Sequence, residues 1–482
     1  MNECVVWWVK RDLRLADTIA LNAALETGLP VVPLFIFEPS ILQAPEYSSM
    51  HAHAQANAIQ SLRDDLQALG SGCIVLKAEG EEAFSYLRKK VEIKAVFSQE
   101  ETGAEFTYIR DRRMAEWFQS QGIVWKEMSQ GGTIRRCNNR NKQELLRKNY
   151  YSAAPLKVPL SIPFLPKALL ELASQPVPSL ADLGFEQSRH LLQRVNEKEA
   201  HVVLKGFLAS RSKGYRYRIS SPTTAFTSGS RLSVHLAWGT ISSRTIFDAV
   251  SNAQKASKNN EQREKDLRAF RSRLHWRDHF IQRLESASWM EFQPLNPLFA
   301  DLPYREDWEK YLAAWLAGET GFPMVDASMR CLSFTGFLNF RMRAMVTSFA
   351  THALRIDWRK INAPLAAIMY DYEPGIHLSQ IQMQAGITGI NTLRVYSPAK
   401  QLADQDQNLI FVRKWLPELS KISNEDVLKA GNSHIPGYIE PIVDFAAETK
   451  LMKDALYSLK KSAENQVEGA KVLRDFGSRL RR

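Results

Sequence analysis

The first third of the chain alternates short apolar runs with longer amphipathic stretches. The apolar runs are rich in β-branched residues, which is typical of strands buried on both faces of a sheet. Between them, residues 17–28 and 51–70 have helical periodicity, with Asp17 as the expected N-cap and Gly28 as the expected stop of the first helix. Alternating strands and helices predict a doubly wound parallel sheet. The predicted strands are 4–9, 31–37, 73–78, 94–99 and 122–128.

The pattern changes after residue 130. Residues 131–200 are rich in basic residues and proline, which is typical of a connection that crosses the surface between domains. From about residue 200 onward helical periodicity dominates. The sequence therefore predicts an α/β domain over 1–130, an interdomain linker over 131–200 and a larger all-α domain over 201–482.

Composition and charge narrow the class of protein. A chain of 482 residues exceeds one compact core, and 45% hydrophobic with 24% charged residues is ordinary for a soluble globular protein. The net charge of +11 favours a polyanionic partner, with nucleic acid the first candidate and an anionic membrane surface the second. No GxGxxG follows the first apolar run and no GxxxxGK occurs, which argues against a standard dinucleotide or nucleoside-triphosphate site.

The cysteines are scattered along the chain at positions 4, 73, 137 and 331. Their spacing predicts free thiols in a reducing compartment and fits no metal site. No segment approaches the roughly 20 apolar residues that a membrane-spanning helix needs. We therefore expect a cytoplasmic protein without a bound metal and without membrane association.

One predicted helix, TGFLNFRMRAMVTSF (335–349), is apolar almost throughout yet carries Arg341 and Arg343. Residues two positions apart do not share a helix face, so each arginine needs its own partner. One ion pair and one surface arginine would satisfy this requirement without any function. A cofactor and an anionic substrate would satisfy it as well.

Several segments resemble the photolyase/cryptochrome superfamily, and they occur in that family's order along nearly the whole chain. The first third contributes VVWWVKRDLRLADTIALNAAL and ETGAEFTYIRDRR. The rest contributes SGSRLSVHLAWGTIS, RLHWRDHF, AGETGFPMVDASMR, the arginine-bearing helix, IDWR, TGIN and YSPAKQ. The resemblance implies that the helical domain binds FAD. It also implies that the α/β domain can hold a second, antenna chromophore (a folate, a deazaflavin or another), with ligands from the region of Glu100, Glu101 and Thr102.

The resemblance further implies which residues contact FAD. The turn SGSRLS (228–233) suits a phosphate, because glycine permits close backbone approach and the amides of a helix start favour anions. Asp371 in YDYEPG matches an acidic residue that pairs with Arg343 beside the flavin ring, which would give that arginine its buried partner. The implied FAD-binding residues are Tyr215, Ser228, Gly229, Ser230, Arg231, Leu232, Ser233, Arg343, Asp371 and Glu373.

A second set of residues matches family positions beside DNA or the lesion. The implied DNA-binding residues are Arg273, Trp276, Arg277, Arg341 and Gln401, of which Arg277 and Gln401 could instead lie beside a cofactor phosphate. The implied catalytic residues are Trp276, which lines the lesion pocket, Arg341 and His377, which takes a position where asparagine is common. The chain also departs from the family, since Arg273 replaces a glutamate and Phe340 replaces an asparagine.

The electron route of the family is incomplete in this sequence. Trp315 matches the outer and Trp358 the middle of three tryptophans that connect the flavin to the surface. The inner tryptophan is absent, with Gln382 at or beside its position, and a lesion-stacking tryptophan near Gln384 is absent too. Either an aromatic residue such as Tyr370 or Tyr372 substitutes for it, or photoreduction is slow.

These features predict a blue-light-dependent, FAD-containing photolyase that splits UV-induced pyrimidine dimers by electron transfer from reduced flavin. The residues leave open whether the lesion is a cyclobutane dimer or a (6-4) product. The alternatives are a cryptochrome-like photoreceptor with little or no repair activity and a flavin-free nucleic-acid-binding module. The expected partner is UV-damaged DNA, and the expected state is a monomer.

Overall fold

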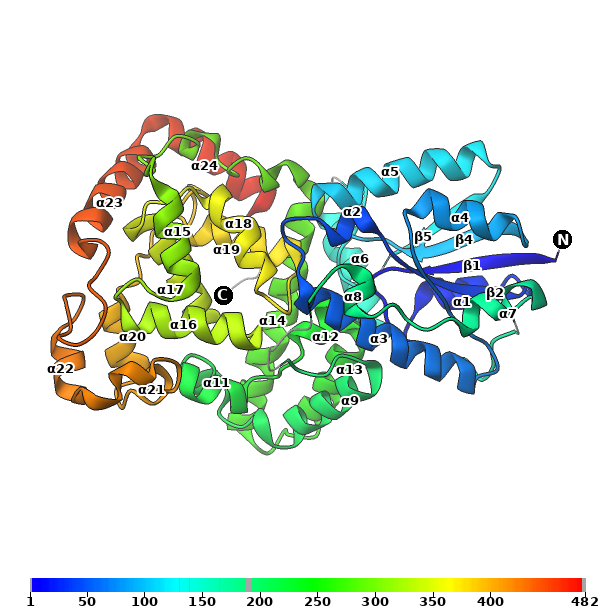
Figure 1. Cartoon of the computed structure of the whole chain (residues 1–482), viewed down its shortest axis with the longest axis horizontal. Coiled ribbons are helices and arrows are strands. Elements are labelled where there is room, and N and C mark those ends of the chain that lie inside the picture. Colours follow the sequence, from blue (N-terminus) through cyan, green and yellow to red (C-terminus); the bar gives the residue numbers. More distant parts are fainter. Residues whose placement is uncertain (1, 130, 138, 164, 187–191, 479–482) are drawn as a thin grey trace. The chain divides into compact units, whose positions relative to one another are not determined.

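Five parallel strands form a sheet in the order β3-β2-β1-β4-β5, which confirms the predicted doubly wound parallel sheet (Figure 1). Each strand overlaps one of the predicted apolar runs. The crossovers place β1 in the centre of the sheet, with β2 and β4 as its neighbours. The strands are β1 (Glu3–Val9), β2 (Val31–Phe37), β3 (Ile74–Lys77), β4 (Glu92–Gln99) and β5 (Val124–Met128).

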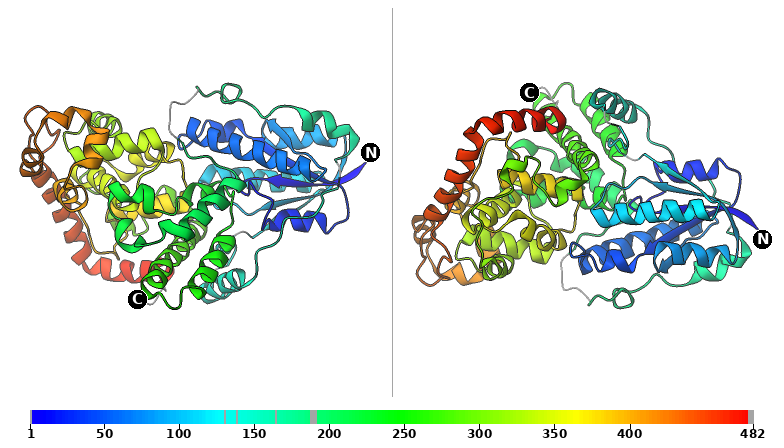
Figure 2. Two further views of the ribbon diagram at one scale, coloured as in Figure 1. Left: turned by 90° about the horizontal axis from the view of Figure 1, so that it is seen from below. Right: turned by 90° about the horizontal axis from the view of Figure 1, so that it is seen from above.

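Helices cover both faces of this sheet (Figure 2). Alternate residues of β1 point to opposite faces, so Trp7 packs in a buried cluster with α1 and α3, and Trp8 in another with α4 and α5. Burial on both faces explains why β1 and β2 read as continuous apolar runs, whereas the edge strand β5 is partly exposed. The covering helices are α1 (Ile19–Leu25), α3 (Ser49–Ala68), α4 (Gly80–Arg88) and α5 (Glu105–Ser120).

Asp17 is not the N-cap that the sequence predicts. The N-cap of α1 is Thr18, and Asp17 is buried with a left-handed backbone, φ 56°. Its carboxylate instead lies 3.1 Å from Nε of Arg244 through both oxygens and accepts a hydrogen bond from the backbone amide of Leu156. The reason is energetic, because a buried arginine without a carboxylate costs more free energy than a short helix without an N-cap.

The structure describes residues 2–129, 131–137, 139–163, 165–186 and 192–478, and the chain divides into two compact units. Unit 1 comprises 1–213, 230–286 and 370–375. Besides the sheet and its helices it contains α2 (Pro39–Leu42), α6 (Arg140–Ser152), α7 (Leu170–Ser174), α8 (Leu180–Leu183), α9 (Glu197–Gly206), α12 (Ser233–Ala237), α13 (Ser243–Lys255) and α14 (Glu261–Ser286).

The compact units do not follow the boundaries at residues 130 and 200 that the sequence pattern predicts. The described part of 131–200 does more than cross the surface, because several of its apolar side chains are buried against the sheet. Ile162 and Leu183 join the cluster of Trp7, whereas Leu165 and Leu169 join the cluster of Trp8. The basic and proline-rich composition therefore hides a segment that completes both faces of unit 1.

Unit 2 comprises 214–229, 287–369 and 376–482, and its described regular structure is helical, as predicted. None of the helices that the structure describes combines the length and the apolar character needed to cross a membrane. The helices of this unit are α10 (Tyr215–Arg218), α11 (Pro222–Ser228), α15 (Trp308–Ala317), α16 (Pro323–Thr335), α17 (Phe340–Ser348), α18 (Trp358–Ala367), most of α19 (Pro374–Gln384), α20 (Pro398–Gln405), α21 (Ile410–Trp415), α22 (Asn424–Lys429), α23 (Phe445–Lys461) and α24 (Ala463–Phe476).

Candidate functional site

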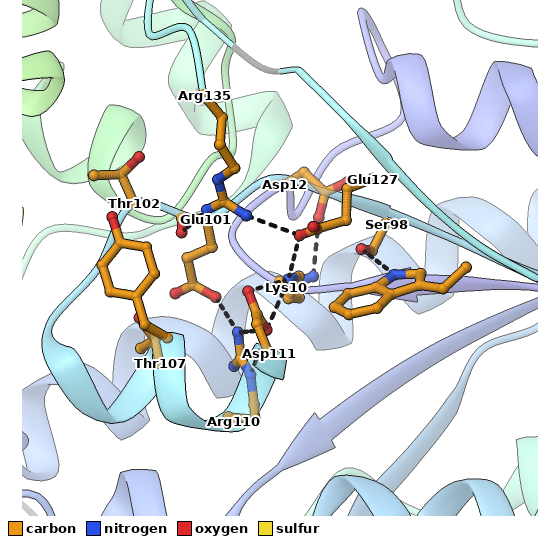
Figure 3. Close-up of polar contacts among 12 residues, drawn as sticks. Lys10, Asp12, Ser98, Glu101, Thr102, Thr107, Arg110, Asp111, Glu127 and Arg135 are labelled. Atoms are coloured by element: carbon orange, nitrogen blue, oxygen red, sulfur yellow. Dashed lines mark hydrogen bonds and ion pairs between the residues drawn. The ribbon is translucent and has the colours of Figure 1, made fainter. Parts of the chain in front are cut away.

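A network of buried charges lies at the carboxyl edge of the sheet (Figure 3). Lys10, directly after β1, places Nζ 3.1 Å from Asp111 and 3.8 Å from Glu127. Arg110, beside Asp111 on α5, places Nη2 2.6 Å from Glu101. Burial alone would raise the pKa of Asp111, but the two cations outweigh it and hold that pKa below its ordinary value. The network therefore keeps charges of both signs at the edge where parallel α/β sheets bind ligands.

Glu38, directly after β2, is the member of this edge with spare hydrogen-bonding capacity. Its Oε1 accepts from Arg110 at 3.1 Å, whereas its buried Oε2 has no hydrogen-bond partner among the described residues. Burial raises the pKa of this carboxyl to about 7. Glu38 can therefore accept a proton near neutral pH and act as either donor or acceptor toward a ligand.

Glu38 lines a cavity within unit 1 that is partly open to solvent. Most of the wall is apolar or aromatic, and a few polar groups converge on it, which is typical of a site for a flat organic ligand. The aromatic wall includes a Trp238 ring that packs 5.5 Å from the ring of His51. Other lining residues are Phe35, Phe37, Glu46, Tyr47, Gln55, Glu101, Arg110 and Tyr372.

A second, more polar cavity in unit 1 shares Arg11 and Glu101 with the first. The structure brings Glu373 to it, between Arg277 at 3.4 Å and Arg11 at 3.9 Å. Glu373 and Arg277 are two of the residues that the family resemblance implies. The Arg277 guanidinium contacts the Glu373 carboxylate here and not a phosphate.

The predicted antenna residues Glu100, Glu101 and Thr102 all line this second cavity. Burial raises the pKa of Glu100 to about 7, and the Thr102 hydroxyl donates to Glu285 at 2.6 Å. Their prediction as chromophore ligands stays a prediction, although Glu101 also reaches the aromatic cavity.

The turn SGSRLS is divided between the two units. In unit 2, α11 ends at Ser228, and an added Cβ on Gly229 would lie 2.7 Å from the carbonyl oxygen of Ala225, so glycine is required there. In unit 1, Arg231 has a left-handed backbone, φ 59°, and its carbonyl accepts from Gln193 at 3.0 Å. The following helix α12 has only five residues, so the predicted phosphate turn does not rest on a long helix start.

The remaining residues of the turn differ in burial. Leu232 is buried and is the N-cap of α12, which begins at Ser233. The carbonyl of Ser230 accepts from Arg211 at 3.3 Å, and its hydroxyl accepts weakly from the amide of Leu232. Tyr215 is buried at the start of α10. That each of these residues binds FAD stays a prediction.

Unit 2 contains several buried polar atoms without a hydrogen-bond partner among the described residues. They include Ser228 Oγ, Asn362 Oδ1, Ser379 Oγ and Gln401 Oε1. Buried polar groups in folded proteins are almost always bonded, so these atoms indicate a ligand rich in hydroxyl, phosphate or ring N–H groups. FAD has all of these groups, and the residues present fit it.

The two arginines of α17 have different surroundings within unit 2. Arg343 donates from Nε to the carbonyl of Leu338 at 2.6 Å and has Nη1 3.7 Å from the sulfur of Met369. Its predicted partner Asp371 belongs to unit 1, and that pairing stays a prediction. Arg341 is half-buried, and its Nε has no hydrogen-bond partner among the described residues.

His377 and Gln401 both lie inside unit 2. The Nε2 atom of His377 lies 3.0 Å from the carbonyl of Asn362 and donates to it, since a carbonyl only accepts. Gln401 on α20 is buried. Burial disfavours a direct contact of Gln401 with DNA, so of its two implied positions the one beside a cofactor phosphate is favoured.

The predicted electron route has both of its tryptophans, but not the expected exposure. Trp315 and Trp358 are fully buried. An outer member of a chain that runs to the surface has to reach solvent, and Trp315 does not. Gln382, at the predicted place of the inner tryptophan, is buried with every polar group bonded to backbone: Oε1 to the amide of Leu295, Nε2 to the carbonyls of Met290 and Gln293.

The predicted lesion-facing residues of α14 form a partly exposed surface in unit 1. The ring of Trp276 stacks on Phe280 at 5.5 Å and meets His279 edge-on at 5.7 Å. Arg273, one turn earlier, is exposed. Trp276 therefore has one face packed and its side chain only half-buried, which leaves it available to a ligand.

The residues that sequence reasoning missed are those of the aromatic cavity, above all Glu38, His51 and Trp238. A signal existed for Glu38, because a carboxylate directly after a buried parallel strand lies at the ligand-binding edge of the sheet. No comparable signal marked His51 or Trp238. They reach the cavity from α3 and from the turn after α12, and a single sequence does not show that these segments meet.

A parallel α/β unit with an edge cavity, together with a helical unit rich in unbonded buried polar atoms, defines a cofactor-binding protein with two candidate chromophore sites. Residues 5–147 match the family model DNA photolyase, and residues 270–458 match the FAD binding domain of DNA photolyase. The chain belongs to the photolyase/cryptochrome superfamily, and FAD is its cofactor.

The relatives that match this chain include proteins named photo-lyase and proteins named cryptochrome. The chain is 27% identical over 486 residues to a deoxyribodipyrimidine photo-lyase of Synechococcus sp., covering 95% of this chain and 97% of the relative. It is 29% identical over 443 residues to a cryptochrome DASH of Gloeobacter violaceus, covering 87% and 86%. Among solved structures, an archaeal photolyase of Sulfolobus tokodaii with two FAD molecules matches with a TM-score of 0.78 at 25% identity, over 95% of this chain and 99% of that one.

Proposed function

We propose that this chain is a blue-light-dependent DNA photolyase that splits UV-induced pyrimidine dimers by electron transfer from reduced FAD. The observation that carries the proposal is the agreement of two family models, DNA photolyase over 5–147 and its FAD-binding domain over 270–458. The Synechococcus relative, which matches 95% of the chain, is named a deoxyribodipyrimidine photo-lyase. The net charge of +11 also supports a nucleic-acid substrate.

The chain's own residues bind and orient the cofactor in this proposal. Bound FAD supplies light absorption and electron donation. Ser228 offers FAD a buried hydroxyl. Gly229 has no side chain, so the protein backbone can come close to FAD there. Arg343 provides a positive charge held in place by the carbonyl of Leu338. The carboxylate of Glu373, fixed between Arg277 and Arg11, can accept hydrogen bonds without moving.

The proposed substrate contacts come from α14 and α17. The half-buried ring of Trp276 stacks on the extruded lesion, since aromatic stacking offsets the cost of taking bases out of the duplex. Arg273 and Arg341 contact phosphates. His377 is the proposed proton donor beside the lesion, and its Nε2 proton has to leave the carbonyl of Asn362 before it can be transferred. Cyclobutane dimers are the proposed lesion, with (6-4) products second.

The aromatic cavity of unit 1 is the proposed site of the second chromophore. The Sulfolobus tokodaii photolyase carries two FAD molecules, with a light-harvesting role suggested for a novel cofactor in that protein. The aromatic walls and the few polar groups that converge on them suit a flat ring system in this chain. Co-purification of a second chromophore, lost or spectrally shifted in Trp238→Ala, is the expected result.

The test is anaerobic illumination of the reduced, FAD-loaded protein with oligonucleotides that carry a single cyclobutane dimer or a single (6-4) product. Restoration of the cyclobutane substrate under blue light, and none in the dark, is the expected outcome. Trp276→Ala should lower the yield per absorbed photon while leaving the flavin spectrum unchanged. Failure to restore either lesion with a full complement of FAD would overturn the proposal.

The second candidate is a cryptochrome-like photoreceptor, and Gln382 is the observation that favours it. A glutamine bonded throughout to backbone leaves no redox-active side chain where the inner tryptophan is expected. Illumination of the oxidised protein with an external reductant separates the candidates. A sensor should change its flavin redox state reversibly while repairing neither lesion.

A further inference from the structure

The turn YDYEPG (370–375) is the stretch of unit 1 that comes latest in the chain, and two side chains from earlier stretches bind its backbone. The indole Nε1 of Trp238 donates to the carbonyl of Tyr370 at 2.9 Å, and Nη2 of Arg11 donates to the carbonyl of Tyr372 at 2.8 Å. Residues 370–373 lie outside the helices and strands. Contacts from side chains of this kind therefore fix where the turn lies.

Arg11 and Trp238 also contact each other, and we call them the Arg11–Trp238 pair. The Arg11 guanidinium lies 5.3 Å from the centroid of the Trp238 ring, and its Nε donates to the carbonyl of Ala237 at 2.8 Å. Its Nη1 lies 3.9 Å from the Glu373 carboxylate. Because a guanidinium is a planar fork of donors, this one side chain joins the loop after β1, the end of α12 and the turn.

The turn contributes to the walls of both cavities of unit 1. Its residues Tyr372 and Pro374 line the aromatic cavity, together with Arg11 and Trp238. Glu373, between them in the sequence, lines the polar cavity, which Arg11 also reaches. The Arg11–Trp238 pair is thus part of the wall of one cavity and binds the turn whose carboxylate lines the other.

The later part of the turn is tied to α14. Arg277 on α14 lies 3.4 Å from the Glu373 carboxylate. At Gly375 an added Cβ would lie 2.6 Å from Cα of Ile281, so the backbone packs closely on this helix. The earlier part, 370–372, is bound by the Arg11–Trp238 pair. A displacement of the pair would therefore move Glu373 relative to Arg277.

We infer that the Arg11–Trp238 pair couples the two cavities of unit 1, so that the wall of the aromatic cavity sets the position of the Glu373 carboxylate toward FAD. Arg11 is a positioning residue in this arrangement, since it acts through the turn. A change made on the aromatic side, at Trp238, reaches the cofactor by the same route. The inference rests on the proposed function in that Glu373 is a proposed FAD contact.

The test measures the release of FAD from the full-length holoprotein after dilution, followed by the recovery of flavin fluorescence. Arg11→Gln should speed release by roughly 10- to 100-fold, the range that corresponds to the lost hydrogen bonds of one charged donor. Trp238→Phe keeps an aromatic ring and loses one neutral hydrogen bond, so it should speed release by roughly 2- to 10-fold.

Arg11→Lys separates position from charge. Lysine keeps a positive charge near Glu373 but has no planar fork, so it cannot bind the carbonyls of Ala237 and Tyr372 in the arginine geometry. This variant should release FAD about as fast as Arg11→Gln. Its flavin midpoint potential should stay near the wild-type value, whereas Arg11→Gln should lower it, because loss of a cation disfavours the anionic reduced flavin.

Hydrogen–deuterium exchange reports on the turn itself, with or without FAD. The backbone amides of 370–373 should exchange faster in Arg11→Gln, Arg11→Lys and Trp238→Phe than in the wild type, because the turn opens more often. Exchange in the strands of the sheet should stay as in the wild type, which shows that the variants are folded.

Two matched controls remove the same kinds of contact elsewhere in unit 1. Arg63→Gln removes a guanidinium that donates to the backbone carbonyl of Gln175. Trp125→Phe removes an indole Nε1 that donates to the Ser98 hydroxyl at 2.9 Å. Both controls should release FAD and exchange the amides of the turn at wild-type rates.

Release and exchange at wild-type rates in Trp238→Phe would overturn the inference, because the wall of the aromatic cavity would then not reach the turn. Wild-type release in Arg11→Lys would overturn it as well, since charge alone would explain the role of Arg11. The outcome is separate from that of the repair assay. Absence of repair with the expected changes in release and exchange defeats only the proposed function, and repair by the wild type with unchanged release in these variants defeats only the inference.

Discussion

The Gln382 side chain uses its polar groups for hydrogen bonds within unit 2. Its side chain donates two hydrogen bonds and accepts one, and all three partners are backbone groups of residues 290–295. Because the residue is fully buried, no water can replace these bonds. The side chain therefore fixes the irregular segment before α15 to α19.

Gln382→Ala should lower the free energy of unfolding by about 2–4 kcal/mol, because it leaves the buried amide of Leu295 and the buried carbonyl of Met290 without partners. The measurement is urea unfolding of the FAD-loaded protein followed by circular dichroism. Gln384→Ala, on the same helix, removes a single bond to Gln380 and should cost less than about 1 kcal/mol. Equal losses in the two variants would contradict the anchoring role of Gln382.

The raised pKa of Glu38 predicts how the stability of the protein depends on pH. Its pKa is about 7 in the folded protein against an ordinary 4.5, so between these values the folded state holds a proton that the unfolded chain has lost. Stability from this group is complete below about pH 4.5 and is lost as the pH rises through 7. Glu38→Gln mimics the protonated acid and should gain up to about 3 kcal/mol over the wild type at about pH 8, and less than about 1 kcal/mol at about pH 5.

Urea midpoints at the two pH values measure this difference. Glu116→Gln on the exposed face of α5 is the control for the loss of a carboxylate as such. A gain of the same size at both pH values would show that the substitution acts through packing and not through the proton.

At the scale of elements, the turn between α12 and α13 meets the loop after β1 at close range. Gly239 has φ +70°, and an added Cβ would lie 1.8 Å from the carbonyl oxygen of Arg11. Arg14 donates to the carbonyl of Gly239 at 2.7 Å, which closes the contact from the other side. The approach is possible only for a residue without a side chain.

Gly239→Ala should therefore cost about 2–5 kcal/mol, from backbone strain and from the displaced loop together. Gly28→Ala is the matched control, because Gly28 has φ +71° and open space around its Cβ position. It should cost only the strain, about 1–2 kcal/mol. Differential scanning calorimetry of both variants checks the difference, and equal costs would rule out the steric part.

Elements with strong periodicity were predictable from the sequence, and their tertiary roles were not. All five apolar runs are strands: β1 and β2 are buried on both faces, and the partly exposed β5 pairs with β4 at the edge of the sheet. Asp17 was predicted as an N-cap from local preference, whereas its role depends on Arg244, more than 200 positions away. The cavity residues His51 and Trp238 escaped notice for the same reason. Family positions gave candidate FAD residues, but burial of Trp315 and Gln401 is visible only in three dimensions.

At the scale of the whole molecule, unit 1 is assembled from three separate stretches of chain. The buried cluster around Trp7 includes Val234, Ala237, Trp238 and Tyr370 from the later stretches. Asp17 depends on Arg244 for its ion pair. The α/β sheet is therefore not an independent domain in the sense that a boundary at residue 130 would imply.

A fragment of residues 1–213 should not fold to the structure seen in the full chain. It lacks part of its apolar core and leaves Asp17 buried without a cation, which costs several kcal/mol. The expected result is binding of a hydrophobic dye and no cooperative thermal transition in near-ultraviolet circular dichroism. A sharp transition with the near-ultraviolet spectrum of a native core would show that the first stretch is sufficient.

Tyr370 is synthesised long after the strands of the sheet, and this order has a consequence for folding during translation. A ribosome adds about 5–20 residues per second, and the sheet strands emerge long before the stretch 370–375 that closes their cluster. During that interval the nascent sheet presents uncovered apolar side chains to the cell. We therefore expect synthesis of this protein to engage holding chaperones at the ribosomal exit, and slowing translation should increase that engagement.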